Sequence, residues 1–512
     1  MKKIAFLLAP ALFVFFVTAS ARAEVKLPHV LSSHMVLQRD RPIHLWGWAD
    51  PGERVTASLH GASAAATADE LGEWSIYLPP ERAGGPYTVT IAGKNTVTID
   101  DVMIGDVWFA SGQSNMQLPL MGFPGSAVVN NGDEEIRNAT HSDIRLLHIP
   151  LKASAYPLRD QGASWTLCTP DTAKTFSAAA YFFAREIAQR EHVTVGIIDS
   201  SWGGTPGEAW ISMHTLGSDA ALMPVFAYWA HLTKNEDDFP RIDAAHEREA
   251  AEAKAAGQPA PWHLWRPENL ESWHPSWLFN GMVAPITPLA IRGVIWYQGA
   301  TNTNVQRAAM YQRIFEALIK DWRMQWREGN FPFLYVQIAA YTSAPQENWP
   351  VVREAQRRTL DAANTAMAVT IDIGDRDNVH PADKQDVGHR LALGARALSY
   401  GEQVEYSGPL FRQTAVDGDQ VQVWFDHAGS GLVAKGGGLT GFEVAGADYK
   451  FVPATAQIEH SGFGDSVVVS SPQVAHPEFV RYGWANFPAV NLFNGAGLPA
   501  SPFTSNKEIP QP

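Results

Sequence analysis

The sequence predicts an α/β protein: a mostly parallel sheet with helices on both faces, flanked by an N-terminal β-sandwich and a C-terminal β module. Two observations favour this fold class. Between about residues 105 and 401, apolar strand-like runs alternate with helical patterns, which is typical of a parallel sheet covered by helices. On either side of this region, short runs rich in β-branched and aromatic residues are separated by turn-forming residues, which is typical of β-sandwiches.

The start of the chain carries the features of a secretory signal peptide, which we place at residues 1–23. Lys2 and Lys3 precede an apolar run, and Ala21 and Ala23 are the small residues expected before a cleavage site. The apolar run is shorter than a typical membrane-spanning helix. The alternative to a cleaved signal peptide is an uncleaved membrane anchor. We therefore expect an exported protein, periplasmic or extracellular, with no membrane attachment after cleavage.

Composition narrows the classes of partner. The formal net charge is −14, which argues against binding to nucleic acid or to an anionic membrane. Because Cys168 is the only cysteine, an intramolecular disulfide framework is excluded, and packed cores must stabilise the fold. Most of the 18 tryptophans are expected in those cores, with sugar-stacking surfaces as the alternative for some. The sequence gives no indication of the oligomeric state.

The pattern along the chain divides it into successive units. Short strands separated by turns such as Asp50-Pro51-Gly52 fill the first unit, and similar strands return after Tyr400. A charged, Ala-rich stretch that becomes rich in Trp and Pro interrupts the α/β region, and we interpret it as a helical insertion. The predicted units are a β-sandwich at 24–104, an α/β domain at 105–401 with the insertion at about 232–274, and a β module at 402–512.

Within the α/β region, helical periodicity is clear in three places. Ser177 is a candidate N-cap for a helix over 178–190. Tyr311, Ile314, Leu318 and Trp322 fall on one face of a second helix, and a third begins after Pro381. In open α/β sheets, reactive groups collect in the loops at the carboxyl ends of the strands, and four loops here carry residues able to do chemistry.

The first of these loops reads Ser-Gly-Gln-Ser-Asn-Met-Gln over 111–117 and places Ser114 between two amide side chains. A serine hydroxyl is a weak nucleophile until a base accepts its proton. The loop does not match the G-x-S-x-G nucleophile elbow, so the α/β-hydrolase alternative loses support. Taken alone, Ser114 is better interpreted as an ordinary turn residue.

Two further loops offer donors for a developing negative charge. Gly203 and Gly204 would let backbone amides approach a ligand closely. Asn302 carries a side-chain amide suited to the same purpose, and Gln298 lies in the same loop. For each loop alone, a plain turn is the simpler interpretation.

The fourth loop contains Asp377 and His380, three residues apart, ahead of the predicted helix that follows Pro381. In an Asp-x-x-His arrangement the carboxylate can accept a hydrogen bond from one imidazole nitrogen, which leaves the other nitrogen to face a nucleophile. The pattern is common by chance, so it gains weight only together with the other loops.

Taken together and in order, these loops resemble those of the SGNH (GDSL-type) hydrolases, and within them the bacterial sialate O-acetylesterase-like carbohydrate esterases. The resemblance extends over almost the whole chain after the signal peptide. Its most specific segments are GDVWFASGQSNMQ, GGTPGEAW, PSWLFNGMVAP, RGVIWYQGATN and DIGDRDNVHPADKQDVGHRLAL.

The resemblance implies a role for each candidate residue. Ser114 would be the nucleophile, His380 the base and Asp377 the residue that orients it. Gly204 and Asn302 would be oxyanion donors beside the Ser114 amide, with Gly203 as the alternative to Gly204. The remaining assignments are substrate binding for Gln113 and Gln298, and bracing of the serine loop by Gln113 and Asn115.

One position departs from the family pattern: Ala300 stands where the family usually has Glu, in Gln-Gly-Glu-Ser-Asn. The implied activity is removal of acetyl groups from sugar hydroxyls, on sialic acids or on hemicelluloses such as xylan or xyloglucan. No metal or organic cofactor is expected. The alternatives are a glycoside hydrolase, with Glu208 and Asp372 as possible carboxylates, and a non-catalytic carbohydrate-binding protein.

Overall fold

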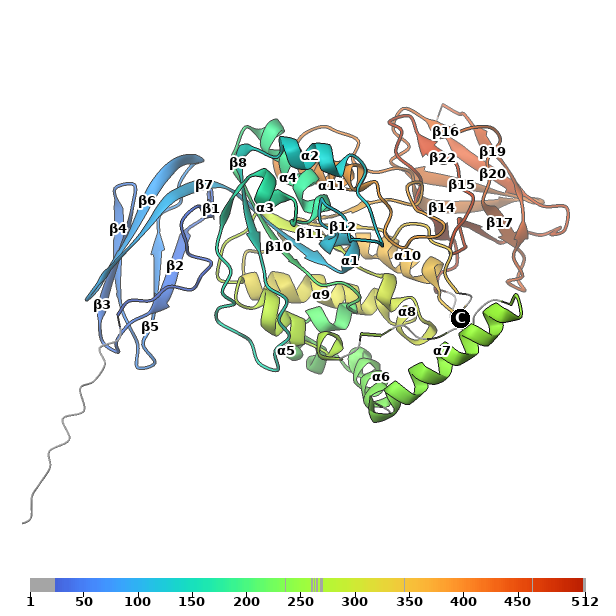
Figure 1. Cartoon of the computed structure of the whole chain (residues 1–512). Coiled ribbons are helices and arrows are strands. Elements are labelled where there is room, and N and C mark those ends of the chain that lie inside the picture. The colour runs from blue at the N-terminus through green and yellow to red at the C-terminus, as the bar shows by residue number, and fades with distance from the viewer. Residues whose placement is uncertain are drawn as a thin grey trace, which may run out of the picture.

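The structure is a computed structural model that describes residues 24–509 except 235, 259–260, 262, 264–265, 268–269, 345 and 463. The expected signal peptide at 1–23 lies outside the described residues. A central sheet with helices on both sides lies between two β-rich parts, one at each end of the chain (Figure 1). Within the described residues, no helix is both long enough and apolar enough to span a membrane.

The N-terminal part consists of short strands, and the long strand β7 (Thr96–Gly112) follows them in the chain. The first half of β7 pairs with β6 and β1, and its second half enters the central sheet. The expected boundary at 104/105 therefore falls inside a continuous strand, and the domain limits stay predictions. The preceding strands are β1 (Val36–Gln38), β2 (Ile43–Trp48), β3 (Arg54–Leu59), β4 (Ala62–Thr67), β5 (Glu73–Leu78) and β6 (Gly84–Ala92).

The central sheet has the strand order β13-β12-β11-β7-β10-β8-β9. All neighbouring pairs are parallel except β8 with β9, which confirms the predicted mostly parallel sheet. Every residue of β10, β11 and β12 is buried, as expected for strands covered on both faces. The strands are β8 (His141–His148), β9 (Thr166–Cys168), β10 (Val195–Ser201), β11 (Gly293–Tyr297), β12 (Phe333–Val336) and β13 (Thr365–Ala368).

Helices cover both faces of this sheet, also as predicted. Alternate residues of β7 point to opposite faces: Trp108 meets Phe183 of α4 edge to face, and Phe109 meets Trp322 of α9 in the same way. Helices α4 (Ala178–Glu191) and α11 (Lys384–Tyr400) lie together on the first face, and α9 (Tyr311–Trp326) and α10 (Trp349–Arg358) on the second. Ser177 caps α4 as expected.

The remaining helices are short, apart from two in the region of the expected insertion. There α7 (Phe239–Ala255) extends away from the body of the molecule (Figure 1), and it follows α6 (Met223–Thr233). A small apolar cluster of Leu232, Phe239, Leu270 and Trp273 packs at the base of this region. The short helices are α1 (Ser114–Gln117), α2 (Gly132–Asn138), α3 (Pro170–Ala173), α5 (Met213–Ser218) and α8 (Val305–Ala308).

The C-terminal part consists of antiparallel strands around a core of its own. Its sheets have the orders β14-β15-β20-β19, β16-β22 and β18-β17-β21-β23. Its strands are β14 (Leu410–Asp417), β15 (Gln420–Asp426), β16 (Leu432–Ala434), β17 (Phe442–Ala445), β18 (Val452–Pro453), β19 (Thr455–Glu459), β20 (Ser466–Ser470), β21 (Phe479–Tyr482), β22 (Leu492–Asn494) and β23 (Phe503–Thr504).

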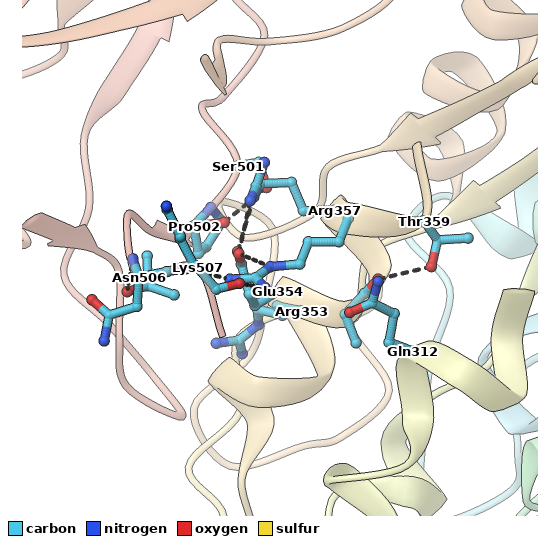
Figure 2. A network of polar contacts seen from close by, with 12 residues as sticks. Gln312, Arg353, Glu354, Arg357, Thr359, Ser501, Pro502, Asn506 and Lys507 are labelled. Atoms are coloured by element: carbon cyan, nitrogen blue, oxygen red, sulfur yellow. Dashed lines mark hydrogen bonds and ion pairs between the residues drawn. The ribbon is translucent and has the colours of Figure 1, made fainter. Parts of the chain in front are cut away.

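Buried polar contacts dock this C-terminal part onto α10. Arg353 is fully buried and donates hydrogen bonds to the carbonyl oxygens of Ala339, Ala485 and Asn486. Arg358 donates to the carbonyl oxygens of Asn506 and Lys507, in the contact between α10 and the 501–507 segment that Figure 2 shows. Since α10 begins directly after the loop at 341–348, these contacts also fix the position of that loop.

Candidate active site

The four loops singled out in the sequence gather at one edge of the central sheet. Strands β10 and β11 flank β7 in parallel register, so their carboxyl ends meet there. A pocket of about 540 Å³ opens at this edge. Its lining residues are Gln113, Ser114, Gln117, Phe123, Gly203, Gly204, Ala300, Thr301, Asn304, Tyr341, Ser343, Glu347, Trp349, Val379 and His380.

A glycine at the end of β7 brings Ser114 into this pocket. Gly112 has φ +137°, and a Cβ there would lie 2.2 Å from the carbonyl oxygen of Tyr297 in β11. Only glycine fits such a close approach of two backbones. The next residue, Gln113, donates its N–H to the same carbonyl at 3.0 Å, and Ser114 then begins the short helix α1. The half-buried serine therefore lies at the pocket wall.

The central contact of the site joins Ser114 to His380. Ser114 Oγ and His380 Nε2 are 2.8 Å apart, although 266 residues separate them in the chain. Burial of the ring, together with the positive charge of Lys384, lowers the pKa of His380 to about 4. The imidazole is therefore neutral near pH 7. With its proton on Nδ1, its Nε2 accepts a hydrogen bond from the serine hydroxyl.

The structure does not bring Asp377 to the ring of His380 in the expected way. Asp377 is exposed, and its backbone N–H donates to the carboxylate of Asp375 at 2.8 Å. Among the described residues, no hydrogen bond joins the Asp377 carboxylate to His380 Nδ1. The loop is held instead through Asn378, whose side-chain oxygen accepts the His380 backbone N–H and whose amide donates to the Ser126 carbonyl.

Asn115 links the two halves of the serine–histidine pair. Its side-chain amide donates to the carbonyl of Val379, the residue before His380, at 2.9 Å. Its side-chain oxygen accepts from Nζ of Lys384 at 2.5 Å. Burial lowers the pKa of Lys384 to about 7, although the charge of Asp383 opposes this effect. Asn115 was expected to brace the serine loop, and these contacts tie that loop to the histidine loop.

The two glycines of the second loop differ in how their backbone N–H groups are used. Gly203 donates its N–H to the side-chain oxygen of Gln117 at 2.8 Å. Gly204 has φ +69°, and within the described part of the chain no acceptor bonds its N–H. The same holds for the N–H of Ser114, at the start of α1. Two residues that line the same pocket, Ser114 and Gly204, thus have unengaged backbone donors among the described residues.

Asn302 lies beneath the pocket wall in a buried polar network. Its side-chain amide donates to Glu208 at 2.9 Å, and its side-chain oxygen accepts from the Gly207 N–H and from Gln298. Glu208 also forms an ion pair with Arg307, with 3.1 Å between Nε and Oε1. All of these residues are buried.

Gln298 is held entirely within this network. Its side-chain amide donates to the Thr205 carbonyl and to Asn302, and its side-chain oxygen accepts from the Tyr311 hydroxyl. Gln298 is 1% exposed and is absent from the pocket lining. Gln113, by contrast, lines the pocket, and its side-chain oxygen accepts the N–H groups of Gly299 and Thr301.

Comparisons with known proteins show the family to which the chain belongs. Residues 266–396 match the family described as carbohydrate esterase, sialic acid-specific acetylesterase. The sialate O-acetylesterases of Homo sapiens and Mus musculus are each 30% identical to the chain over 441 residues, covering 78% of this chain and 75% and 78% of theirs. The chain belongs to this family. It is therefore a carboxylic ester hydrolase.

A solved structure extends the likeness to the whole fold. The crystal structure of a carbohydrate acetylesterase from Xanthomonas citri is 36% identical and superposes with a TM-score of 0.81, covering 94% of this chain and 100% of that chain. The match confirms the predicted family and fold class, and the predicted ester hydrolase class. Within the described residues, no group of three or more His, Cys, Asp or Glu side chains is arranged to hold a metal ion.

The carboxylate in the pocket of this esterase, Glu347, was not identified from the sequence. Glu347 lies on the loop before α10, where no strand, motif or spacing distinguishes it. An isolated bridge pairs Glu347 with Asn304, and the Asn348 N–H donates to the Thr303 carbonyl at 2.6 Å. These contacts between two separate loops bring the carboxylate into the pocket of Ser114, and no local sequence pattern could have revealed them.

Proposed function

We propose that this esterase is an exported carbohydrate O-acetylesterase that uses Ser114 as nucleophile and His380 as general base. The 2.8 Å contact between Ser114 Oγ and His380 Nε2, inside a pocket at the carboxyl ends of the sheet, carries the proposal. An acetylated sugar fits the family, whose members include sialate O-acetylesterases and a bacterial carbohydrate acetylesterase. Export rests on the signal-like residues at the start of the chain.

The proposed reaction has two steps. Ser114 Oγ attacks the acetyl carbonyl carbon as His380 Nε2 takes the hydroxyl proton, and the same proton passes to the leaving sugar oxygen. Water then attacks the acetyl-enzyme and gives up a proton to His380, which passes that proton to Ser114 Oγ as the acyl–oxygen bond breaks, so that acetate and free Ser114 are formed. The lowered pKa of His380 keeps the ring neutral and able to accept a proton at neutral pH.

The negative charge on the tetrahedral oxygen needs donors that are already in place. The unengaged N–H groups of Ser114 and Gly204 support these two residues as oxyanion donors, in preference to Gly203, whose N–H is bonded to Gln117. Asn302 is fully buried and absent from the pocket lining, and its amide already donates to Glu208, so it would serve as the third donor only through the second proton of that amide. For Asp377, whose carboxylate makes no hydrogen bond to His380 within the described residues, we propose stabilisation of the imidazolium that forms during the reaction through its negative charge in the same loop.

For the two glutamines the contacts favour different roles. Gln113 lines the pocket and joins the serine loop to the loop at 299–301, which supports both bracing and substrate contact. Gln298 is buried and fully bonded, so we propose that it braces Asn302 and does not touch substrate.

The glycoside hydrolase alternative finds little support in the contacts of its candidate carboxylates. Glu208 is buried in an ion pair with Arg307, and Asp372 is paired with Arg390 at 2.6 Å. Neither lines the pocket of Ser114. An assay of acetate released from acetylated xylan, xyloglucan and sialic acids by the wild type and by Ser114→Ala tests the proposal. New reducing ends, or acetate release that survives the substitution, would refute it.

A further inference from the structure

The lining of the pocket that holds Ser114 and His380 includes one carboxylate, Glu347, which three donors hold. Its Oε2 accepts hydrogen bonds from Thr303 Oγ1 at 2.7 Å, from Ser343 Oγ at 2.8 Å and from Trp349 Nε1 at 3.3 Å. Three donors from different side chains fix the position of this oxygen. Glu347 is therefore held in place by its neighbours and does not need a ligand to order it.

The second carboxylate oxygen of Glu347 is not engaged. Among the described residues, no donor bonds Oε1 and no Lys, Arg or His forms an ion pair with Glu347. The group is half-buried and lines the same pocket as Ser114. A carboxylate held on one side and free on the other has a strong acceptor available for a ligand that donates hydrogen bonds.

The support for Glu347 extends into the C-terminal β module. Asn486 of that module accepts the Tyr341 N–H through its carbonyl oxygen, which also accepts a hydrogen bond from Arg353. Its side-chain amide donates to the Ser343 and Ala344 carbonyls at 3.5 and 3.3 Å. The loop that carries Glu347 is thus anchored at both ends, as a binding wall requires.

The lining of the pocket carries a negative charge that no Lys or Arg of the lining balances. Among the described residues that line it, Glu347 has the only carboxylate, and Lys and Arg are absent. The half-buried ring of Tyr341, which packs edge to face on the buried ring of Trp349 with 5.6 Å between their centres, adds apolar surface to the same pocket. Such a surface suits a neutral sugar, whose hydroxyl groups donate hydrogen bonds and whose C–H faces pack on aromatic rings. The carboxylate of a sialic acid would meet Glu347 without a compensating cation.

We propose that Glu347 is a specificity-determining residue that accepts a hydrogen bond from a hydroxyl group of a neutral acetylated sugar and disfavours anionic sialic acid esters. This inference rests on the proposed esterase function of Ser114 and names its substrate class.

Glu347→Gln tests the inference with little disturbance of the fold. The amide oxygen can keep the three bonds from Thr303, Ser343 and Trp349, so the amide nitrogen takes the position of the unengaged Oε1. The substitution therefore replaces an acceptor by a donor and removes the charge. The matched control is Glu70→Gln, an exposed carboxylate of the N-terminal part.

The readout is kcat/KM on an acetylated xylo-oligosaccharide, an O-acetylated sialic acid and p-nitrophenyl acetate. We expect the wild type to favour the neutral sugar ester. Glu347→Gln should lower kcat/KM on that ester by about 10-fold, because loss of one hydrogen bond to a charged group weakens binding of the transition state by about that factor. It should raise kcat/KM on the sialic acid ester and leave p-nitrophenyl acetate within about 2-fold, since that ester has no sugar hydroxyl and no carboxylate. Glu70→Gln should change none of the three.

The outcomes separate this inference from the proposed function. Unchanged turnover of the neutral ester in Glu347→Gln, or a wild type that favours the sialic acid ester, overturns the role of Glu347 while the esterase remains. Equal losses on all three substrates also overturn it, because they indicate a disturbed serine site. A wild type that hydrolyses p-nitrophenyl acetate but releases no acetate from either sugar overturns both.

Discussion

Lys384 Nζ lies 2.5 Å from the side-chain oxygen of Asn115, the residue next to Ser114. Lys384 is fully buried at the start of α11 and also lies over the ring of Tyr297, 5.3 Å from its centre. The contact therefore joins the helix after the histidine loop to the loop of the nucleophile. It also places a positive charge near His380, where it disfavours the imidazolium.

The pH dependence of the wild type follows from the pKa of His380. Neutral imidazole is the active form, so kcat/KM is at its maximum above this pKa and falls as the pH drops through it. Burial and Lys384 bring that pKa to about 4, below the ordinary value of about 6.5. We expect the acid limb of kcat/KM on p-nitrophenyl acetate to lie near pH 4. A limb near 6.5 would contradict the burial of the ring.

Lys384→Met should move this acid limb to higher pH. The substitution removes the charge that disfavours imidazolium, so the pKa of His380 should rise. It also removes the bond to Asn115, so we expect kcat to fall by roughly 10-fold or less. The pH profile separates the two effects, because a purely structural loss lowers the plateau without moving the limb. Lys320→Met, at an exposed site on α9, is the control and should change neither.

Ser114→Ala and His380→Ala should each reduce kcat by about 10⁴-fold or more, because each removes a group needed for proton transfer and attack. The double variant should lose little beyond either single variant, since the two groups act as a unit. Steady-state kinetics on p-nitrophenyl acetate measure this, with thermal unfolding to show that the fold is retained. Losses that multiply would mean that the 2.8 Å contact is not used in the reaction.

Asp377→Asn should be more harmful than Asp375→Asn. Asp377 is proposed to stabilise the imidazolium, and its amide variant should lower kcat by roughly 10-fold or more. Asp375 accepts the N–H groups of Asp377 and Asn378, and an asparagine side-chain oxygen can still accept both. We therefore expect a change of less than about 3-fold for Asp375→Asn, measured on the same substrate. The reverse order would show that loop shape, and not the charge of Asp377, supports His380.

Asn302→Ala should lower both activity and stability. Loss of an oxyanion donor reduces kcat by about 10²–10³-fold with a smaller effect on KM. Glu208 and the Gly207 N–H would also lose a buried partner, at about 1–3 kcal/mol for each unsatisfied group. Urea unfolding measures this loss, and Asn138→Ala, an exposed asparagine of α2, is the control. A stable variant with only a raised KM would make Asn302 a substrate-binding residue.

The fold class and the positions of the reactive loops could be predicted because they depend on local patterns. Alternation of apolar strand runs with helical runs predicts the parallel sheet, and parallel strands bring their carboxyl-end loops to one edge. The four loops of Ser114, Gly204, Asn302 and His380 were therefore placed correctly at the level of the sheet. The local spacing of Asp377 and His380 did not predict their contacts in the same way, because backbone bonds to Asp375 and Asn378 shape that loop.

By itself the sequence determined the sheet, its helices and which loops would meet. Tertiary structure alone decided which atoms within those loops touch. In the folded chain Nε2 of His380 contacts Ser114 Oγ, Gln298 is buried outside the pocket lining, and Glu347 lines the pocket. The physical reason is that the periodicity of apolar residues indicates which face of one helix or strand is buried. A hydrogen bond depends instead on the distance and angle between two groups. Those groups can be 266 residues apart, as Ser114 and His380 are, and their geometry is set by every element packed between them.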